Sequence, residues 1–119
     1  MINKFTDLIA WKESHKLVLF VYELLRKFPR NEEYALSDQI RRCSVSISSN
    51  IAEGFSRQGK KEKLQFYHIS KGSLTELENQ MIIAKDVRYI TDIDLVNFEK
   101  QSDFVGRLIT GLIKSIRNR

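Results

Sequence analysis

The sequence is poor in the residues that build disulfide-linked, metal-bound and turn-rich proteins. Its 119 residues include one cysteine, one proline, two histidines and five glycines. A lone Cys43 can form neither an intramolecular disulfide nor a cysteine-cluster metal site, as is usual in a reducing cytoplasm. No glutamate stands three residues before a histidine, the pairing that di-iron bundles use. Collagen-like, low-complexity and turn-rich β architectures are excluded, and we expect no metal and no cofactor.

Long apolar runs are also absent. The longest, residues 17–22, is bounded by Lys16 and Glu23 and is far shorter than the ~20 residues that cross a bilayer. The first residues carry charge and no apolar signal core. We therefore expect a cytoplasmic protein with no membrane partner.

Apolar residues recur at spacings of three and four residues through most of the chain. This periodicity predicts four amphipathic helices, over about residues 7–28, 38–55, 60–87 and 92–117. Because the connections between them are short, we expect residues 1–119 to form one all-α domain, an antiparallel up-down-up-down four-helix bundle.

Five residues give the expected ends of these helices. Pro29 ends the first helix, Ser37 is a candidate N-cap for the second, and Gly54 is its C-terminal stop. Thr91 and Asp94 form a predicted capping box at the start of the fourth.

The first helix is apolar over more than one face. One stripe consists of Leu8, Trp11, His15, Val18, Tyr22 and Leu25, and a second beside it consists of Leu17, Phe20, Leu24 and Phe28. A helix in a monomeric bundle needs a single stripe about 100° wide. Because most soluble oligomers are homo-oligomers, burial against identical copies is the simplest use of the surplus.

The net charge of +5 is unevenly distributed. Residues 54–71 hold five bases and one acid, residues 73–103 three bases and seven acids, and residues 104–119 four bases and no acid. This polarity suits phosphate binding and head-to-tail subunit pairing equally well.

The predicted turn between the second and third helices is the strongest candidate for nucleic-acid binding. Four bases and three aromatic residues occur in or beside it: Arg57, Lys60, Lys61, Lys63, Phe55, Phe66 and Tyr67. Clustered bases bind phosphates without sequence preference, and exposed aromatic rings stack on bases. The alternative is a solvated basic turn whose aromatic residues belong to the core, and the sequence leaves both open.

Arg41 and Arg42 are adjacent in the second helix, so their side chains point about 100° apart. One interpretation is phosphate contact. The other is an ion-pair network with acids such as Asp38 or Glu53 at a helix or subunit interface. The sequence favours neither.

Catalytic motifs do not occur in usable form. Residues 54–61 approach the phosphate-binding loop G-x-x-x-x-G-K-[ST]. That loop needs a preceding strand and a hydroxyl after its lysine, whereas a predicted helix and Lys61 stand here. Cys43 has no histidine near it in sequence to act as a base. We therefore expect a non-enzymatic protein.

The longest distinctive motif of the sequence is residues 36–54, LSDQIRRCSVSISSNIAEG. Five shorter segments accompany it in order along the chain: Trp11-Lys12, Phe28-Pro29, Arg57, Lys61-Glu62 and residues 72–78, GSLTELE. This pattern resembles a bacterial four-helix bundle family. The family includes proteins encoded by 23S ribosomal RNA intervening sequences and the accessory variability proteins of diversity-generating retroelements. The resemblance covers about residues 5–90 in order, and the fourth helix matches in pattern alone.

The resemblance implies a non-enzymatic bundle that assembles as a homo-oligomeric ring, typically a homopentamer. Retroelement members bind nucleic acid and a reverse transcriptase, which implies RNA or DNA and such a protein as partners. The family's shared polar set corresponds to Gln39, Arg41, Arg42, Asn50, Glu53 and Arg57. Gln39, Asn50 and Glu53, with Gly54, are expected to organise helix and subunit contacts, and Arg57 and the lysines after it are expected to be more exposed.

The chain departs from the family at two positions. Ser48 stands where members often have proline, and the family's Leu-Gly-Tyr-Ile is Val87-Arg88-Tyr89-Ile90 here. A left-handed residue 88 would cost ~1–2 kcal/mol without glycine, so we expect the third helix to end differently.

These observations predict a homo-oligomeric accessory factor whose basic surface binds RNA or DNA without strong sequence specificity. The expected contacts are six bases: Arg41, Arg42, Arg57, Lys60, Lys61 and Lys63. The alternative is a protein–protein scaffold or adaptor without direct nucleic-acid contact.

Overall fold

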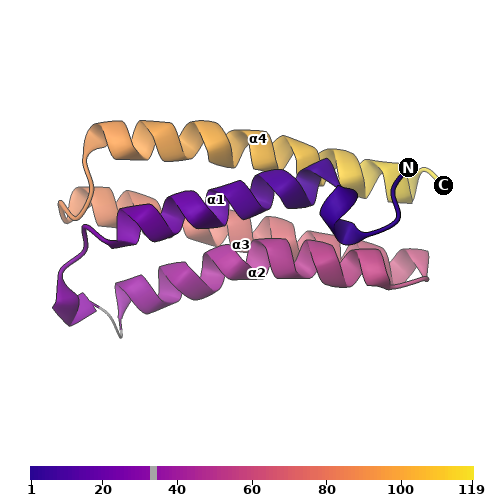
Figure 1. The fold of residues 1–119 in the computed structure, drawn as a ribbon, viewed down its shortest axis with the longest axis horizontal. Helices are drawn as coiled ribbons and strands as arrows, with labels where there is room; N and C mark the ends of the chain where they lie inside the picture. The colour runs from indigo at the N-terminus through magenta and orange to yellow at the C-terminus, as the bar shows by residue number, and fades with distance from the viewer. Residues whose placement is uncertain (33–34) are drawn as a thin grey trace.

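The computed structural model describes residues 1–32 and 35–119. Its elements are the 3-10 turns η1 (Phe5–Asp7) and η2 (Arg30–Glu32) and the helices α1 (Ile9–Leu25), α2 (Leu36–Ser56), α3 (Lys60–Asp86) and α4 (Asp92–Arg117). The described residues contain no strand, which confirms the all-α expectation. Figure 1 shows the four helices side by side, with connections at alternating ends and both termini at one end, in a molecule 45 × 25 × 21 Å in extent.

The core lies along the centre of the bundle and receives side chains from every helix. Fully buried members are Leu17 and Val21 of α1, Ile40, Ile47 and Ile51 of α2, Tyr67, Leu77 and Met81 of α3, and Phe98, Val105 and Ile109 of α4. Of the two apolar stripes predicted for the first helix, the one containing Leu17 and Leu24 is buried. The other stripe is buried only in part: Leu25 belongs to the core and Leu8 and Trp11 pack against it, whereas His15 and Tyr22 are exposed. The position of His15 on an apolar stripe predicts a structural histidine of the core, and this prediction is wrong. His15 is exposed and stacks on Trp11, with ring centroids 4.9 Å apart.

Three of the predicted helix ends differ in the structure. α1 ends at Leu25, three residues before the end predicted from Pro29. The backbone N–H groups of residues 26–28 donate to the carbonyls three residues earlier, so these residues form tight turns and not α-helix. Ala35, and not Ser37, is the N-cap of α2, and Ser37 lies buried within the helix. Gly54 does not stop α2, which continues to Ser56.

The start of α4 has the predicted capping box. Asp94 N donates to Thr91 Oγ1 and Thr91 N donates to Asp94 Oδ2, both at 3.0 Å. Lys27 Nζ reaches the same carboxylate at 2.8 Å and thereby joins the end of α1 to the start of α4. The Lys27 hydrogen bond and that of the Thr91 backbone hold the pKa of Asp94 below its usual value.

Arg88 occupies the left-handed position between α3 and α4, with φ of 69°. Tyr89 N donates to Ala84 O at 2.8 Å, so the chain closes α3 with the hydrogen bond that normally accompanies glycine. α3 ends at Asp86. The expectation that it ends differently without glycine is wrong, because Arg88 adopts the left-handed conformation and the backbone is strained there.

We therefore expect Arg88→Gly to raise the free energy of unfolding by about 1 kcal/mol, because glycine adopts this φ without a Cβ clash. Urea denaturation measures the change. Arg88→Ala is the matched control, since it removes the same charge but keeps the Cβ, and it should not stabilise. Equal effects of the two substitutions would assign the gain to charge and contradict the strain argument.

None of the described helices is long and apolar enough to span a membrane.

Candidate nucleic-acid interface

One end of the bundle brings together two basic segments that are far apart in the sequence. Because α3 begins and α4 ends there, residues 54–71 lie beside residues 104–119, and together they hold nine bases and one acid. We call these two segments the basic end. Lys60 Nζ donates to the Arg119 carbonyl at 3.3 Å and ties the segments together. The acid-rich residues 73–103 form the other half of the α3–α4 pair, so the molecule is bipolar along its length.

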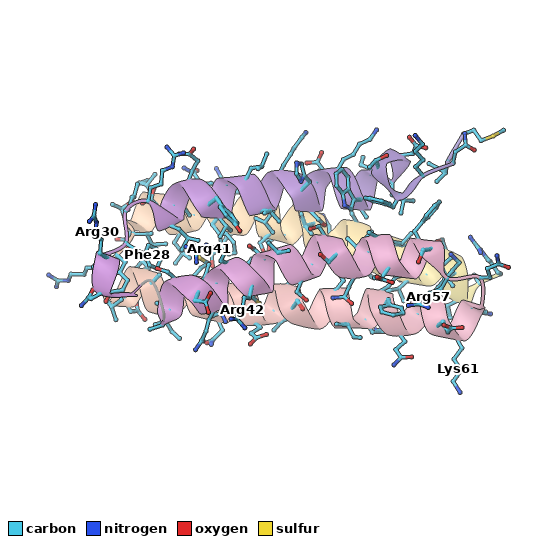
Figure 2. All side chains as sticks on the ribbon, turned by 60° about the horizontal axis from the view of Figure 1, so that its bottom comes forward. Phe28, Arg30, Arg41, Arg42, Arg57 and Lys61 are labelled. Carbon is cyan, nitrogen blue, oxygen red and sulfur yellow. The ribbon has the colours of Figure 1, made fainter. Side chains whose placement is uncertain are left out.

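Arg57 lies at the basic end but is paired within the chain. Its guanidinium is 3.2 Å from Glu53 Oε2 and 4.0 Å from Glu62 Oε2, and it lies over the Phe66 ring, 5.0 Å from the centroid. Lys61 is exposed, has no ion-pair partner among the described residues, and points away from the bundle in Figure 2. Of the two, Lys61 is the base available to a phosphate.

Lys63 is buried and closes the end of α2. Its Nζ donates to Gly54 O at 3.2 Å and to Phe55 O at 2.9 Å, two carbonyls of the last turn of α2. Gly54 O also accepts from Arg57 N at 3.3 Å. Burial, with a smaller effect of Arg119, lowers the pKa of Lys63. This cation is held by the fold, so it is not available as a phosphate contact.

The aromatic residues beside the predicted turn also belong to the fold. Tyr67 is 1% exposed, whereas Phe55 and Phe66 are half-buried beneath the cations of Lys63 and Arg57. This arrangement favours the alternative in which the rings pack rather than stack on bases.

Arg41 and Arg42 lie far from Arg57 and Lys61, toward the other end of α2 (Figure 2). Both pair with Asp38 on their own helix, through Arg41 Nη1 at 3.9 Å and Arg42 Nε at 3.1 Å. The Arg41 guanidinium also lies over the Tyr22 ring of α1, 5.8 Å from its centroid. The six predicted bases therefore do not form one surface. Asp38, and not Glu53, is the acid that pairs with these two arginines, and because all three residues belong to α2 these ion pairs do not join two helices.

The expected structural residues follow one stripe of α2 beside α3. Asn50 Nδ2 donates to Ser46 O at 2.8 Å, and Ser46 Oγ shares a hydrogen bond of 2.9 Å with Ser73 Oγ of α3. Gln39 is exposed and lines a shallow groove between α2 and α3, together with Ser46 and Ser73. Glu53 pairs with Arg57 as described, and Gly54 is buried against Tyr67. Gly54 thus contacts α3, whereas the hydrogen bond of Asn50 and the ion pair of Glu53 stay within α2 and its C-cap.

Cys43 lines the same groove with a buried thiol. Its Sγ donates to Ser73 O at 3.0 Å. Burial, reinforced by the Glu76 carboxylate, raises the pKa of Cys43 to about 12, so the thiolate that a nucleophile requires is scarce at neutral pH. Among residues 1–32 and 35–119, no three His, Cys, Asp or Glu side chains come together to hold a metal ion.

Three cations that motif reasoning did not single out line a groove between α3 and α4. Lys71, Arg107 and Lys114 border this groove, which has a volume of about 560 Å³. All three are exposed and, in the part of the chain that the structure describes, lie farther than 4.0 Å from any carboxylate oxygen. The seven-residue spacing of Arg107 and Lys114 is the sequence signal that places them on one helix face.

Comparisons with known proteins give a family model and a solved structure. The model described as 23S rRNA-intervening sequence protein matches residues 6–111. A crystal structure of a protein of unknown function from the S23 ribosomal protein family, from Bacteroides thetaiotaomicron VPI-5482, is similar over 89% of this chain and 99% of its own. The identity is 21% and the TM-score 0.82, so the likeness is one of fold. No curated protein matches the chain.

Proposed function

The chain belongs to the 23S rRNA-intervening sequence protein family, and on this premise we propose that it is a non-enzymatic, homo-oligomeric accessory factor that binds RNA or DNA without strong sequence specificity. The observation that carries the proposal is the basic end, where the fold joins two segments of like charge. The family name associates it with ribosomal RNA, so RNA is the first ligand to test.

Lysines and arginines bind nucleic acid by displacing counterions from phosphates, and this gain needs cations that the protein has not already neutralised. Within residues 1–32 and 35–119, Lys61 has no ion-pair partner, and the Lys60 ammonium contacts the main-chain oxygen of Arg119. Such contacts position a backbone without reading bases, which gives affinity with little sequence preference.

Reversing the charge of both residues, Lys60→Glu with Lys61→Glu, should weaken RNA binding by at least tenfold at 50 mM salt. The slope of log K against log salt should become shallower by about 1.4, the contribution of two phosphates on a single strand. Fluorescence anisotropy of a labelled RNA over a salt series measures both. Lys100→Glu is the matched control, since it lies in the acid-rich half of α4 and should have a smaller effect. A wild-type protein that retains no nucleic acid at low salt would contradict the proposal.

A second function, a protein–protein scaffold or adaptor, is favoured by apolar side chains on the outside of the bundle. Leu19 and Tyr22 of α1 and Val45 of α2 are exposed. On this alternative, a protein partner such as a reverse transcriptase binds a ring of copies, a homopentamer by resemblance to the family. Recovery of that partner after nuclease treatment, without retained nucleic acid, distinguishes the scaffold from the nucleic-acid-binding factor.

A further inference from the structure

We propose that the groove between α3 and α4 holds the phosphate backbone of a single-stranded segment of the bound nucleic acid. The inference rests on the proposed function and assigns the binding to a surface formed largely by residues outside the predicted turn.

The cations of the groove come from both of its walls. Lys71 projects from α3, while Arg107 and Lys114 project from α4. The two α4 residues are two helical turns apart, so their Cα atoms are separated by about 10 Å along the axis. Because no carboxylate of the described residues lies within 4.0 Å of the three side chains, they can present charge to successive phosphates of one strand.

Small side chains between these cations let a backbone approach closely. Gly106 and Gly111 line the α4 wall, and a Cβ built on Gly111 would meet nothing within 4 Å. Thr110 adds a hydroxyl, a group that donates to phosphate oxygens in protein complexes with nucleic acids, whereas the Thr75 hydroxyl donates to Lys71 O at 3.4 Å. The described lining includes no aromatic residue on which a base would stack, so the groove is suited to a backbone and not to base recognition.

The other end of the groove is acidic and limits how far a polyanion extends. Glu78 and Asp103 line it, and Glu78 accepts a hydrogen bond from Ser102 Oγ. A strand therefore occupies the half nearest the basic end. The groove is a furrow on the surface of two packed helices, and its volume of about 560 Å³ suits a short stretch of one extended strand but is too small for a duplex to enter.

The test combines a charge variant with a variant that fills the groove. Lys71→Glu with Lys114→Glu should weaken binding of labelled oligouridylate at least tenfold at 50 mM salt and make the salt slope shallower by about 1.4. Gly111→Leu leaves the charge unchanged, favours the helix over glycine and fills the groove, so it should weaken binding at least fivefold. Lys12→Glu is the matched control, because this exposed residue of α1 does not line the groove, and it should change affinity less than threefold.

The outcomes separate the groove from the function. If wild type binds oligouridylate and both groove variants bind like Lys12→Glu, the groove assignment is overturned while the proposed function stands. If wild type binds neither oligouridylate nor duplex RNA at 50 mM salt, the proposed function fails and the groove assignment with it. A duplex that binds as tightly as the single strand overturns the strand assignment. A polyglutamate peptide that binds as tightly as oligouridylate overturns nucleic acid as the ligand, in favour of an acidic protein segment.

Discussion

Gly54→Ala is expected to lower the free energy of unfolding by about 1–3 kcal/mol, the cost of overpacking a close-packed core. A Cβ at Gly54 would lie 2.5 Å from Tyr67 Cε1 and 2.8 Å from Tyr67 Cδ1. The Tyr67 ring is 1% exposed, so it cannot move aside into solvent. The residue must be glycine because a Cβ would overlap this ring of α3, even though glycine disfavours a helix.

Gly72→Ala is the matched control, because Gly72 is helical and a Cβ there meets nothing within 4 Å. That substitution should stabilise the protein by about 0.5–1 kcal/mol, the usual gain of alanine over glycine in a helix. Urea denaturation of both variants gives the comparison. Because Tyr67→Leu removes the clashing ring, the double variant with Gly54→Ala should be more stable than the sum of the single effects predicts. Additive effects, or stabilisation by Gly54→Ala, would show that the ring does not impose the glycine.

Gly54 also shows where prediction from the sequence fails. Glycine near the end of an apolar stripe favours a helix stop, but here tertiary packing determined its role and α2 continues past it. The capping box of Thr91 and Asp94 was predicted correctly, because its signal is carried by neighbouring residues. The expectation that the third helix ends differently without a glycine at residue 88 was wrong, because Arg88 adopts the left-handed conformation. The all-α fold follows from such local patterns, since each helix has its own period.

The candidate site was less predictable because pairing of charges depends on the fold. Lys63 and Lys61 are equivalent in the sequence, yet one caps α2 and the other is exposed to solvent. Residues 104–119 join residues 54–71 because α4 returns antiparallel to α3, and no motif in either segment records that contact. Lys71, Arg107 and Lys114 were counted in segment charges, but only the packing of α3 on α4 brings them to one groove.

Tyr22→Lys combined with Val45→Lys is expected to convert the proposed oligomer to single chains. Tyr22 of α1 and Val45 of α2 are 41% and 38% exposed. Arg41 precedes Val45 by one turn of α2, and its guanidinium lies over the Tyr22 ring. The three residues therefore form one outer face of the bundle. The two lysines add like charges beside Arg41 on a surface that self-association would desolvate. Such a juxtaposition costs several kcal/mol, which raises the subunit dissociation constant by about 100-fold or more.

Light scattering coupled to size exclusion measures the mass directly, and a homopentamer should give five chain masses for wild type and one for the double variant. Both substitutions are at exposed helical positions where lysine is well tolerated, so the circular dichroism should stay unchanged. Ile93→Lys is the control: this residue is 67% exposed in the first turn of α4, at the end of the bundle rather than on its side, and the assembly should persist. A closed ring needs contacts between the sides of neighbouring bundles. An intact oligomer in the double variant would therefore place the subunit interface on another side of the bundle. A monomeric wild-type protein would contradict the proposed ring.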